Sequence, residues 1–421
     1  MTSSYEPLVQ DFKNWIYRSR DRRHDFHEAI KTAKDVNNGG AGEMSLENIN
    51  TLEDYFRFCN DFLRWVPKVD TASDAVLRKI LVFYWIFNQP DVEIYQTQIT
   101  PANAGTDPTW LSYWQVLYAR QIGSFLDTKD STSGIDSFYK NPIYNTEADK
   151  WEDPPGGEWA SFNQFFARHW KDIDEARPLN PDDTADNVVT SAADSRFGDT
   201  FPVENGIVEI KGFQWPIKKL LQESWDDFND GCFMHAFLSP SDYHRQHAPV
   251  SGEVLEAKVI PELVYLHVTK DSDSSPGLVA DRGLLVKKPL TTERRLKQLL
   301  AGGGKKLRSL INGAGINLTE DITAPDDPGY QWCQTRGLIV IQTENYGKVA
   351  VLPIGMAQVS SVVLSVEKGQ TVTKGDEISY FQFGGSDIVL VFEKPVDYSV
   401  VMGDKCNIRT RIATFHEDPT S

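Results

Sequence analysis

The chain has 421 residues, of which 40% are hydrophobic and 11% aromatic, so it is long enough for more than one domain and apolar enough to be globular. Its 60 acidic residues outnumber 43 basic ones, and the net charge of −17 argues against nucleic acid or an anionic membrane as a general partner. The four separated cysteines, without a CxxC pair, and the lack of a secretory signal in residues 1–20 favour a reducing, cytoplasmic location.

Residues 5–145 show helical periodicity, which predicts a helical N-terminal region over residues 1–150. Val9, Phe12 and Ile16 fall on one helical face, and Thr51 begins a capped segment. Two further sets of apolar residues keep this spacing: Leu52, Tyr55, Phe56, Cys59, Phe62 and Leu63, and Leu111, Trp114, Tyr118, Ile122 and Phe125. The longest apolar run, residues 80–87, is too short to span a bilayer, so we expect a soluble protein without stable membrane insertion.

His24 and His27 are the first candidate metal ligands along the chain. Two histidines three residues apart share a helical face, but no third ligand lies nearby in the sequence. A solvated helix face is the better interpretation, and we expect no metal site.

A domain boundary is predicted at residues 153–157, Asp-Pro-Pro-Gly-Gly, which neither a helix nor a central strand would cross. The next segment, residues 162–170, has Phe162, Phe165, Phe166 and Trp170 at helical spacing, as in a helix that faces a core.

From about residue 186 short apolar runs separated by glycines indicate a β-rich domain, which we place at residues 158–421. The predicted fold class is therefore α+β. Residues 270–330 resemble an insertion with a basic stretch at 287–308, which is either a patch for phosphate or membrane or a solvated helix face.

Near the C-terminus, residues 381–387 (Phe-Gln-Phe-Gly-Gly-Ser-Asp) separate two predicted strands, 376–380 and 388–392. Glycine lets a neighbouring hydroxyl approach the backbone closely, so Ser386 Oγ can reach the carbonyl carbon of Gly385. The simpler interpretation is a glycine bulge followed by an ordinary strand serine.

Two other stretches carry residues suited to activating a serine. His244 and His247 lie in a proline-flanked segment, and a neutral imidazole near pH 7 is a good general base. They could also be structural histidines or half of a metal site. Asp194, in a turn of small residues, could orient His247 as in a Ser-His-Asp triad, or it could bond only to its own backbone.

Together these stretches resemble the phosphatidylserine decarboxylases, a family that cuts itself at a Gly-Ser bond and converts the serine into a pyruvoyl group. The resemblance covers roughly residues 160–415 in the family's order. Its motifs are Phe162-Asn163-Gln164-Phe165-Phe166-Ala167-Arg168, Ala176-Arg177-Pro178-Leu179, Ser191-Ala192-Ala193-Asp194, Ile210-Lys211-Gly212, residues 242–252 (Asp-Tyr-His-Arg-Gln-His-Ala-Pro-Val-Ser-Gly) and Phe383-Gly384-Gly385-Ser386. The helical residues 5–145 look like the extension of a soluble fungal branch that includes tryptophan decarboxylases of the psilocybin type.

The resemblance assigns a role to each site residue. Ser386 would become the pyruvoyl group after cleavage from Gly385, His247 would be the base for cleavage and Asp194 its orienting acid. His244 would position the substrate carboxylate or handle protons during decarboxylation.

The resemblance also implies the partners. The pyruvoyl ketone would form a Schiff base with a substrate amine and accept the electrons released with CO₂, so neither pyridoxal phosphate nor another external cofactor is needed. Two fragments would form, and the family tends to dimerise, so a homodimer is left open.

Asp387 stands where the family usually has threonine or serine, which puts a carboxylate beside the pyruvoyl and in contact with substrate. A second anion such as a phosphate would fit less well there. We therefore expect a small soluble amino acid, aromatic or tryptophan-like, as substrate, with phosphatidylserine as the alternative.

Two alternatives belong to other classes. The chain could remain uncleaved and act as a binding or scaffold protein, because Asp387 could block maturation. It could also be a serine hydrolase built on Ser386, His247 and Asp194, although no GxSxG elbow is present.

Overall fold

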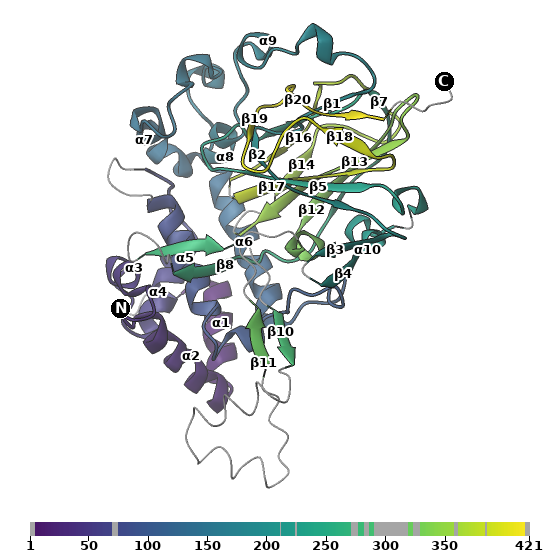
Figure 1. The fold of residues 1–421 in the computed structure, drawn as a ribbon. Helices are drawn as coiled ribbons and strands as arrows, with labels where there is room; N and C mark the ends of the chain where they lie inside the picture. The colour runs from purple at the N-terminus through teal and green to yellow at the C-terminus, as the bar shows by residue number, and fades with distance from the viewer. Residues whose placement is uncertain are drawn as a thin grey trace.

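The structure is a computed structural model. It describes residues 5–69, 75–210, 212–223, 225–270, 277–281, 286–289, 319–322, 329–357, 361–383 and 385–416. Helices of the first third of the chain lie beside a β-rich part formed by the rest, as Figure 1 shows. The α+β class predicted from the sequence is confirmed.

The described α-helices include those predicted from apolar spacing around residues 9–16, 52–63 and 111–125. They are α1 (Pro7–Tyr17), α2 (Arg20–Ala33), α3 (Ala41–Leu46), α4 (Leu52–Phe62), α5 (Ala75–Phe87), α6 (Trp110–Leu126), α7 (Ile135–Lys140), α8 (Phe162–Phe166), α9 (Ile173–Ala176) and α10 (Ile217–Leu221). Thr51 forms a complete capping box with Asp54 at the start of α4, as predicted. The predicted face of α1 is buried, with the Phe12 ring stacked 4.3 Å from Trp114 of α6. None of the described helices is both long and apolar enough to cross a bilayer.

The helix predicted over residues 162–170 is shorter than expected. It ends at Phe166, and Trp170 lies beyond it in an isolated bridge with Trp151. The backbone of residues 150–152 bonds to that of residues 169–171, and this pairing replaces the next helical turn. The prediction that Trp170 belongs to this helix was therefore wrong, although its side chain is buried as expected.

An antiparallel eight-stranded sheet forms the centre of the β-rich part, in the order β15-β7-β12-β13-β17-β5-β2-β19. Its strands are β2 (Ser195–Pro202), β5 (Cys232–Leu238), β7 (Gly252–Ile260), β12 (Arg336–Gln342), β13 (Lys348–Met356), β15 (Thr371–Val372), β17 (Gly385–Phe392) and β19 (Lys405–Cys406). Strand β17 lies between β13 and β5.

A second sheet, β14-β16-β6, covers part of the eight-stranded sheet. It consists of β14 (Val362–Leu364), β16 (Glu377–Phe381) and β6 (Arg245–His247), and β14 contacts β7, β12 and β13. At Gly337 of β12 an added Cβ would lie only 2.9 to 3.2 Å from Pro353, Val362 and Leu364, so a glycine allows this close packing.

The remaining described strands form small sheets. They are β1 (Val188–Thr190), β18 (Val396–Tyr398) and β20 (Arg411–Phe415) in one sheet, and three pairs: β3 (Ile207–Ile210) with β4 (Phe213–Pro216), β8 (His267–Lys270) with β9 (Leu278–Asp281), and β10 (Val286–Pro289) with β11 (Thr319–Ile322). The β8-β9 pair packs on α5, and Leu278 N–H donates to Glu43 Oε1 at 2.8 Å. Most of the predicted insertion, including the basic residues 291–308, lies outside the described residues.

Candidate active site

The Gly385–Ser386 bond lies inside strand β17. The strand begins at Gly385, not at Ile388 as predicted, and Ser386 is paired with Gly355 of β13 and with Leu238 of β5. The prediction failed because glycine, serine and aspartate are poor strand formers, whereas two neighbouring strands impose the extended backbone. The bond is thus held in the eight-stranded sheet, with Gly385 paired to Met356 of β13 and Ser386 paired on both sides.

Aromatic side chains gather at the segment that leads into this bond. The ring of Phe383 lies 5.3 Å from that of Phe162, 5.4 Å from Phe166 and 6.2 Å from Trp65. The backbone N–H of Phe383 donates to Asn163 Oδ1 at 3.1 Å. The N-terminal helical region, through Trp65, therefore contributes to the surroundings of residues 381–387, the predicted cleavage segment.

His244 lies against the same aromatic group. Its ring stacks on Phe166 at 3.9 Å, its carbonyl accepts from the N–H of Phe381 at 2.9 Å, and it is 1% exposed. Burial lowers the pKa of His244 to about 3, so the imidazole is neutral at pH 7. The structure thus places His244 beside the predicted cleavage segment.

His247 is held in one tautomer by a backbone carbonyl. Its Nδ1 lies 2.7 Å from the carbonyl oxygen of Gly375, and since that oxygen can only accept, Nδ1 carries the proton. Nε2 is then buried and carries a lone pair, and it has no hydrogen-bond partner among the described residues. Burial lowers the pKa of His247 to about 4. A neutral imidazole with a free Nε2 is the state that a general base needs.

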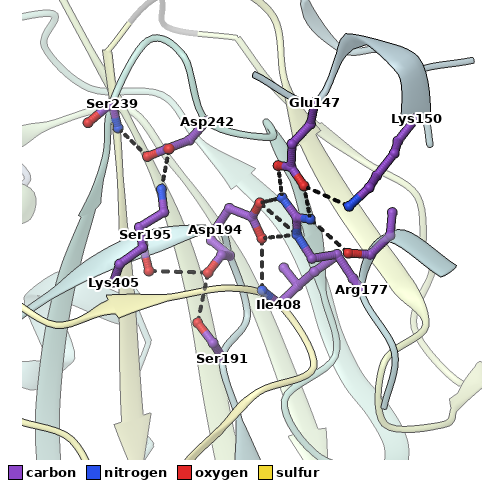
Figure 2. A network of polar contacts seen from close by, with 12 residues as sticks. Glu147, Lys150, Arg177, Ser191, Asp194, Ser195, Ser239, Asp242, Lys405 and Ile408 are labelled. Atoms are coloured by element: carbon purple, nitrogen blue, oxygen red, sulfur yellow. Dashed lines mark hydrogen bonds and ion pairs between the residues drawn. The ribbon is translucent and has the colours of Figure 1, made fainter. Parts of the chain in front are cut away.

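Asp194 does not make the contact with His247 that a triad requires. Both carboxylate oxygens accept from Arg177, with Nη2 to Oδ2 at 2.6 Å, and Oδ1 also accepts from the N–H of Ile408 at 2.9 Å. Figure 2 shows the Arg177 guanidinium between the carboxylates of Asp194 and Glu147. Within the described part of the chain, the hydrogen bond expected between Asp194 and His247 is therefore replaced by one between Asp194 and Arg177.

The charges of this network are coupled through burial. Asp194 is 1% exposed, and burial raises the pKa of its carboxyl while Arg177 opposes that shift. The bond from Arg177 lowers the pKa of Glu147. Removing one partner of a buried ion pair costs about 3–5 kcal/mol of stability. Loss of either Asp194 or Arg177 should therefore leave the other as an unpaired buried charge and destabilise the fold.

Asp387 pairs with a histidine that the sequence reasoning missed. Its Oδ2 lies 3.3 Å from Nε2 of His235 on β5, and both side chains are buried. His235 precedes by two residues the register partner of Asp387, so the two share a face of the sheet. A lone histidine within the apolar β5 run was the available signal for this pair.

The same register places the Asp387 carboxylate away from the two predicted histidines. Asp387 shares its face with Ile354 and Arg336, whereas Gly337, one position along, packs on β14. The β14-β16-β6 sheet, which carries His247, therefore covers the opposite face from the Asp387 carboxylate. The Asp387 carboxylate therefore lies where it gives no geometric reason to exclude a substrate phosphate.

We expect the His235–Asp387 pair to stabilise the fold. Replacing His235 with leucine leaves a buried carboxylate without its imidazole and should lower the free energy of unfolding by about 3–5 kcal/mol. Urea denaturation in a Ser386→Ala background measures this without a change of cleavage state. The double change His235→Leu with Asp387→Thr should restore most of the loss, and failure to do so would contradict a specific pairing.

The comparisons with known proteins fit this site. The sequence profile described as phosphatidylserine decarboxylase matches residues 162–414, which is more than half of the chain. The chain belongs to the phosphatidylserine decarboxylase family. Members of this family are carboxy-lyases that use a pyruvoyl group made from their own chain, so the predicted class of enzyme and cofactor is confirmed.

Three relatives show the extent of the similarity. Phosphatidylserine decarboxylase proenzyme 2 of Komagataella phaffii is 31% identical over 248 residues, 56% of this chain and 18% of its own length. The proenzyme of Fusobacterium nucleatum is 29% identical over 269 residues, 61% of this chain and 69% of its own. Proenzyme 3 of Schizosaccharomyces pombe is 28% identical over 268 residues, 62% of this chain and 22% of its own. The match thus spans less than a quarter of the two yeast proteins.

Proposed function

We propose that this chain is a self-processing decarboxylase that cleaves itself between Gly385 and Ser386 and then decarboxylates a small L-amino acid. The observation that carries the proposal is the continuous contact from His244 through Phe166 to Phe383, two residues before the bond. This contact links His244, the residue before β6, to the predicted cleavage segment.

Cleavage follows from groups that the chain itself supplies. Ser386 Oγ attacks the carbonyl carbon of Gly385 while Nε2 of His247 accepts the hydroxyl proton. The C–N bond then breaks, His247 returns that proton to the Ser386 nitrogen, and an ester remains. Loss of the α-proton of residue 386 expels the Gly385 carboxylate and leaves dehydroalanine. Water then releases ammonia and leaves a ketone at residue 386.

The residues that the structure describes around position 386 fit a pyruvoyl group there. The buried Nε2 of His247 has no partner among them, and the backbone of residue 386 is fixed between two strands. A pyruvoyl ketone supplies an electron sink for the loss of CO₂ from an α-amino acid. Nε2 of His244 lies 3.3 Å from the Pro240 carbonyl oxygen, which can only accept, so Nε2 carries the proton. The buried Nδ1, which lacks a partner in the described part of the chain, keeps its lone pair and is proposed to take up a proton beside the substrate instead of holding its carboxylate.

His244→Gln should separate cleavage from decarboxylation. Because His247 keeps its place on β6, the variant should still split, whereas CO₂ release should fall by about 10²–10⁴-fold. Gel analysis and trapping of ¹⁴CO₂ on the same preparation measure the two steps. Loss of both steps with an unchanged melting temperature would contradict the separate roles.

The two fragments should stay together after cleavage. The short fragment of 36 residues, beginning at position 386, supplies β17, which lies between β13 and β5 of the long fragment. Separating them would expose two strand edges and a buried apolar strand. Native gel filtration should therefore elute both fragments in one peak.

An aromatic amino acid is the substrate that we favour. The rings of Trp65, Phe162, Phe166 and Phe383 surround the cleavage segment and suit an aromatic side chain by offset and edge contacts. Trp65 comes from the N-terminal helical region, so that region also contributes a ring to this group. A decarboxylation screen over the twenty amino acids tests this, with tryptophan and other aromatic acids expected to give the highest rates.

Phosphatidylserine is the second candidate, since the similar proteins of known name are phosphatidylserine decarboxylase proenzymes. With Asp387 facing away from His247, its charge gives no reason to exclude a phosphate. Phosphatidylserine vesicles should be included in the same screen. CO₂ release from them and from no free amino acid would overturn the first choice.

A further inference from the structure

The carbonyl oxygen of Gly375, which orients His247, accepts a second hydrogen bond. Nδ1 of His247 lies 2.7 Å from it and Nε of Arg409 lies 3.2 Å from it. Gly375 has φ +89°, and a Cβ there would lie 2.9 Å from Arg409 Nε. The close approach of the arginine thus depends on a glycine, and the carbonyl that fixes the imidazole is fixed in turn by the guanidinium.

The backbone of Arg409 is held in an unusual conformation. Its φ of +66° lies in the left-handed region, which non-glycine residues rarely adopt and which is often retained at functional sites. Arg409 N–H donates to the Ser191 carbonyl at 3.3 Å, and Ile408 N–H donates to Asp194 Oδ1 at 2.9 Å. The Asp194 carboxylate therefore helps to hold the turn that presents Arg409.

We propose that Arg409 is a positioning residue for His247, and that Asp194 acts on this base through the 408–409 turn and the Gly375 carbonyl. Glu147 extends the chain of contacts, because it binds the other side of the Arg177 guanidinium that holds Asp194. The inference rests on the proposed self-cleavage. It explains how an acid bonded to arginine still influences the imidazole.

The charge of Arg409 adds a pH effect to the geometric one. The charged groups that act on the pKa of His247 are Glu377 of β16, which raises it, and Arg409 and Arg245, which lower it. The Tyr243 ring lies 5.9 Å from the His247 ring. Burial is the main cause of the lowered His247 pKa, and the Arg409 charge lowers it further. Removing the guanidinium should therefore raise this pKa and move the acid limb of the cleavage rate to higher pH.

Arg409→Gly is the informative variant, because glycine relieves the positive φ and so should preserve the fold while deleting the side chain. Arg409→Lys keeps the positive charge but loses the planar guanidinium, whose Nε donates to the Gly375 carbonyl. A short pulse of cell-free synthesis is diluted into buffers from about pH 3.5 to about pH 7, a range that brackets the lowered His247 pKa, and the cleaved fraction is followed on gels. Melting temperatures are measured in a Ser386→Ala background.

We expect Arg409→Gly to slow cleavage by about 10- to 100-fold, through misplacement of the base, and to shift the acid limb upward. Arg409→Lys should slow cleavage without that shift. Arg411→Gln is the matched control, since Arg411 lies two residues away and bonds to Asp183 instead, and it should cleave at the parent rate. Asp194→Asn combined with Arg409→Gly should be no slower than the slower single variant, because the two act in series.

Two results would overturn the inference. Arg409→Gly could cleave at the parent rate with an unchanged pH profile, or its slower cleavage could come with a lowered melting temperature and an unshifted acid limb, which indicates a structural role only. Failure of the proposed function looks different: the parent chain would not cleave, or His247→Gln would cleave normally.

Discussion

Ser386→Ala should leave the 421-residue chain in one piece and without decarboxylase activity. Alanine lacks the hydroxyl that attacks the Gly385 carbonyl, so neither the ester nor the ketone can form. The expected loss of activity is complete, not partial, because the catalytic group is made from this side chain. Denaturing gels and intact-mass measurement report the covalent state, and CO₂ release reports the activity.

Ser386→Cys is the matched control for this prediction. A thiol keeps a nucleophile at the same atom position, so this variant should still split, more slowly than the parent. Cleavage of the alanine variant at the parent rate would show that the bond is cut by a contaminating protease or at another residue.

The second large effect is expected for His247→Gln, which should slow self-cleavage by about 10²–10⁴-fold. Glutamine can still bond to the Gly375 carbonyl through its amide, but it has no lone pair basic enough to accept the Ser386 proton. A time course of cleavage after synthesis measures the effect. His416→Gln changes a histidine that is 54% exposed and bonded to Asp397, and it should cleave at the parent rate.

The lowered pKa of His247 gives this prediction a pH signature. Because the pKa lies at about 4, the imidazole keeps its lone pair at pH 5, and the cleavage rate should begin to fall only as pH approaches 4. An ordinary histidine would lose activity below about pH 6.5. A rate that halves near pH 6.5 would contradict the buried, neutral base.

Local patterns were sufficient to predict α1 and α4. The faces of α1 and α4 follow from apolar residues spaced three or four apart, and the start of α4 follows from Thr51 and Asp54. Trp170 failed the same rule because the backbone pairing of residues 169–171 with residues 150–152 is non-local and overrides the helical spacing. The start of β17 was missed for a related reason, since pairing with β13 and β5 extends this strand to residues that are poor strand formers.

The site was predictable only in part. His244, His247 and Ser386 stand in short motifs, so a resemblance could locate them. The contacts that set their chemistry join distant segments: Glu147 to Arg177, and Arg409 to Gly375. No local pattern marks such residues, and Asp194 was given a direct contact with His247 because the usual triad has one.

The proposed function depends on cleavage of one peptide bond, and intact-mass analysis of the freshly purified protein tests that cleavage most directly. We predict two species, residues 1–385 and a fragment of 36 residues, with the latter lighter by one molecule of ammonia than a fragment that begins with serine. A single species of 421 residues, or a short fragment with an intact N-terminal serine, would contradict the account.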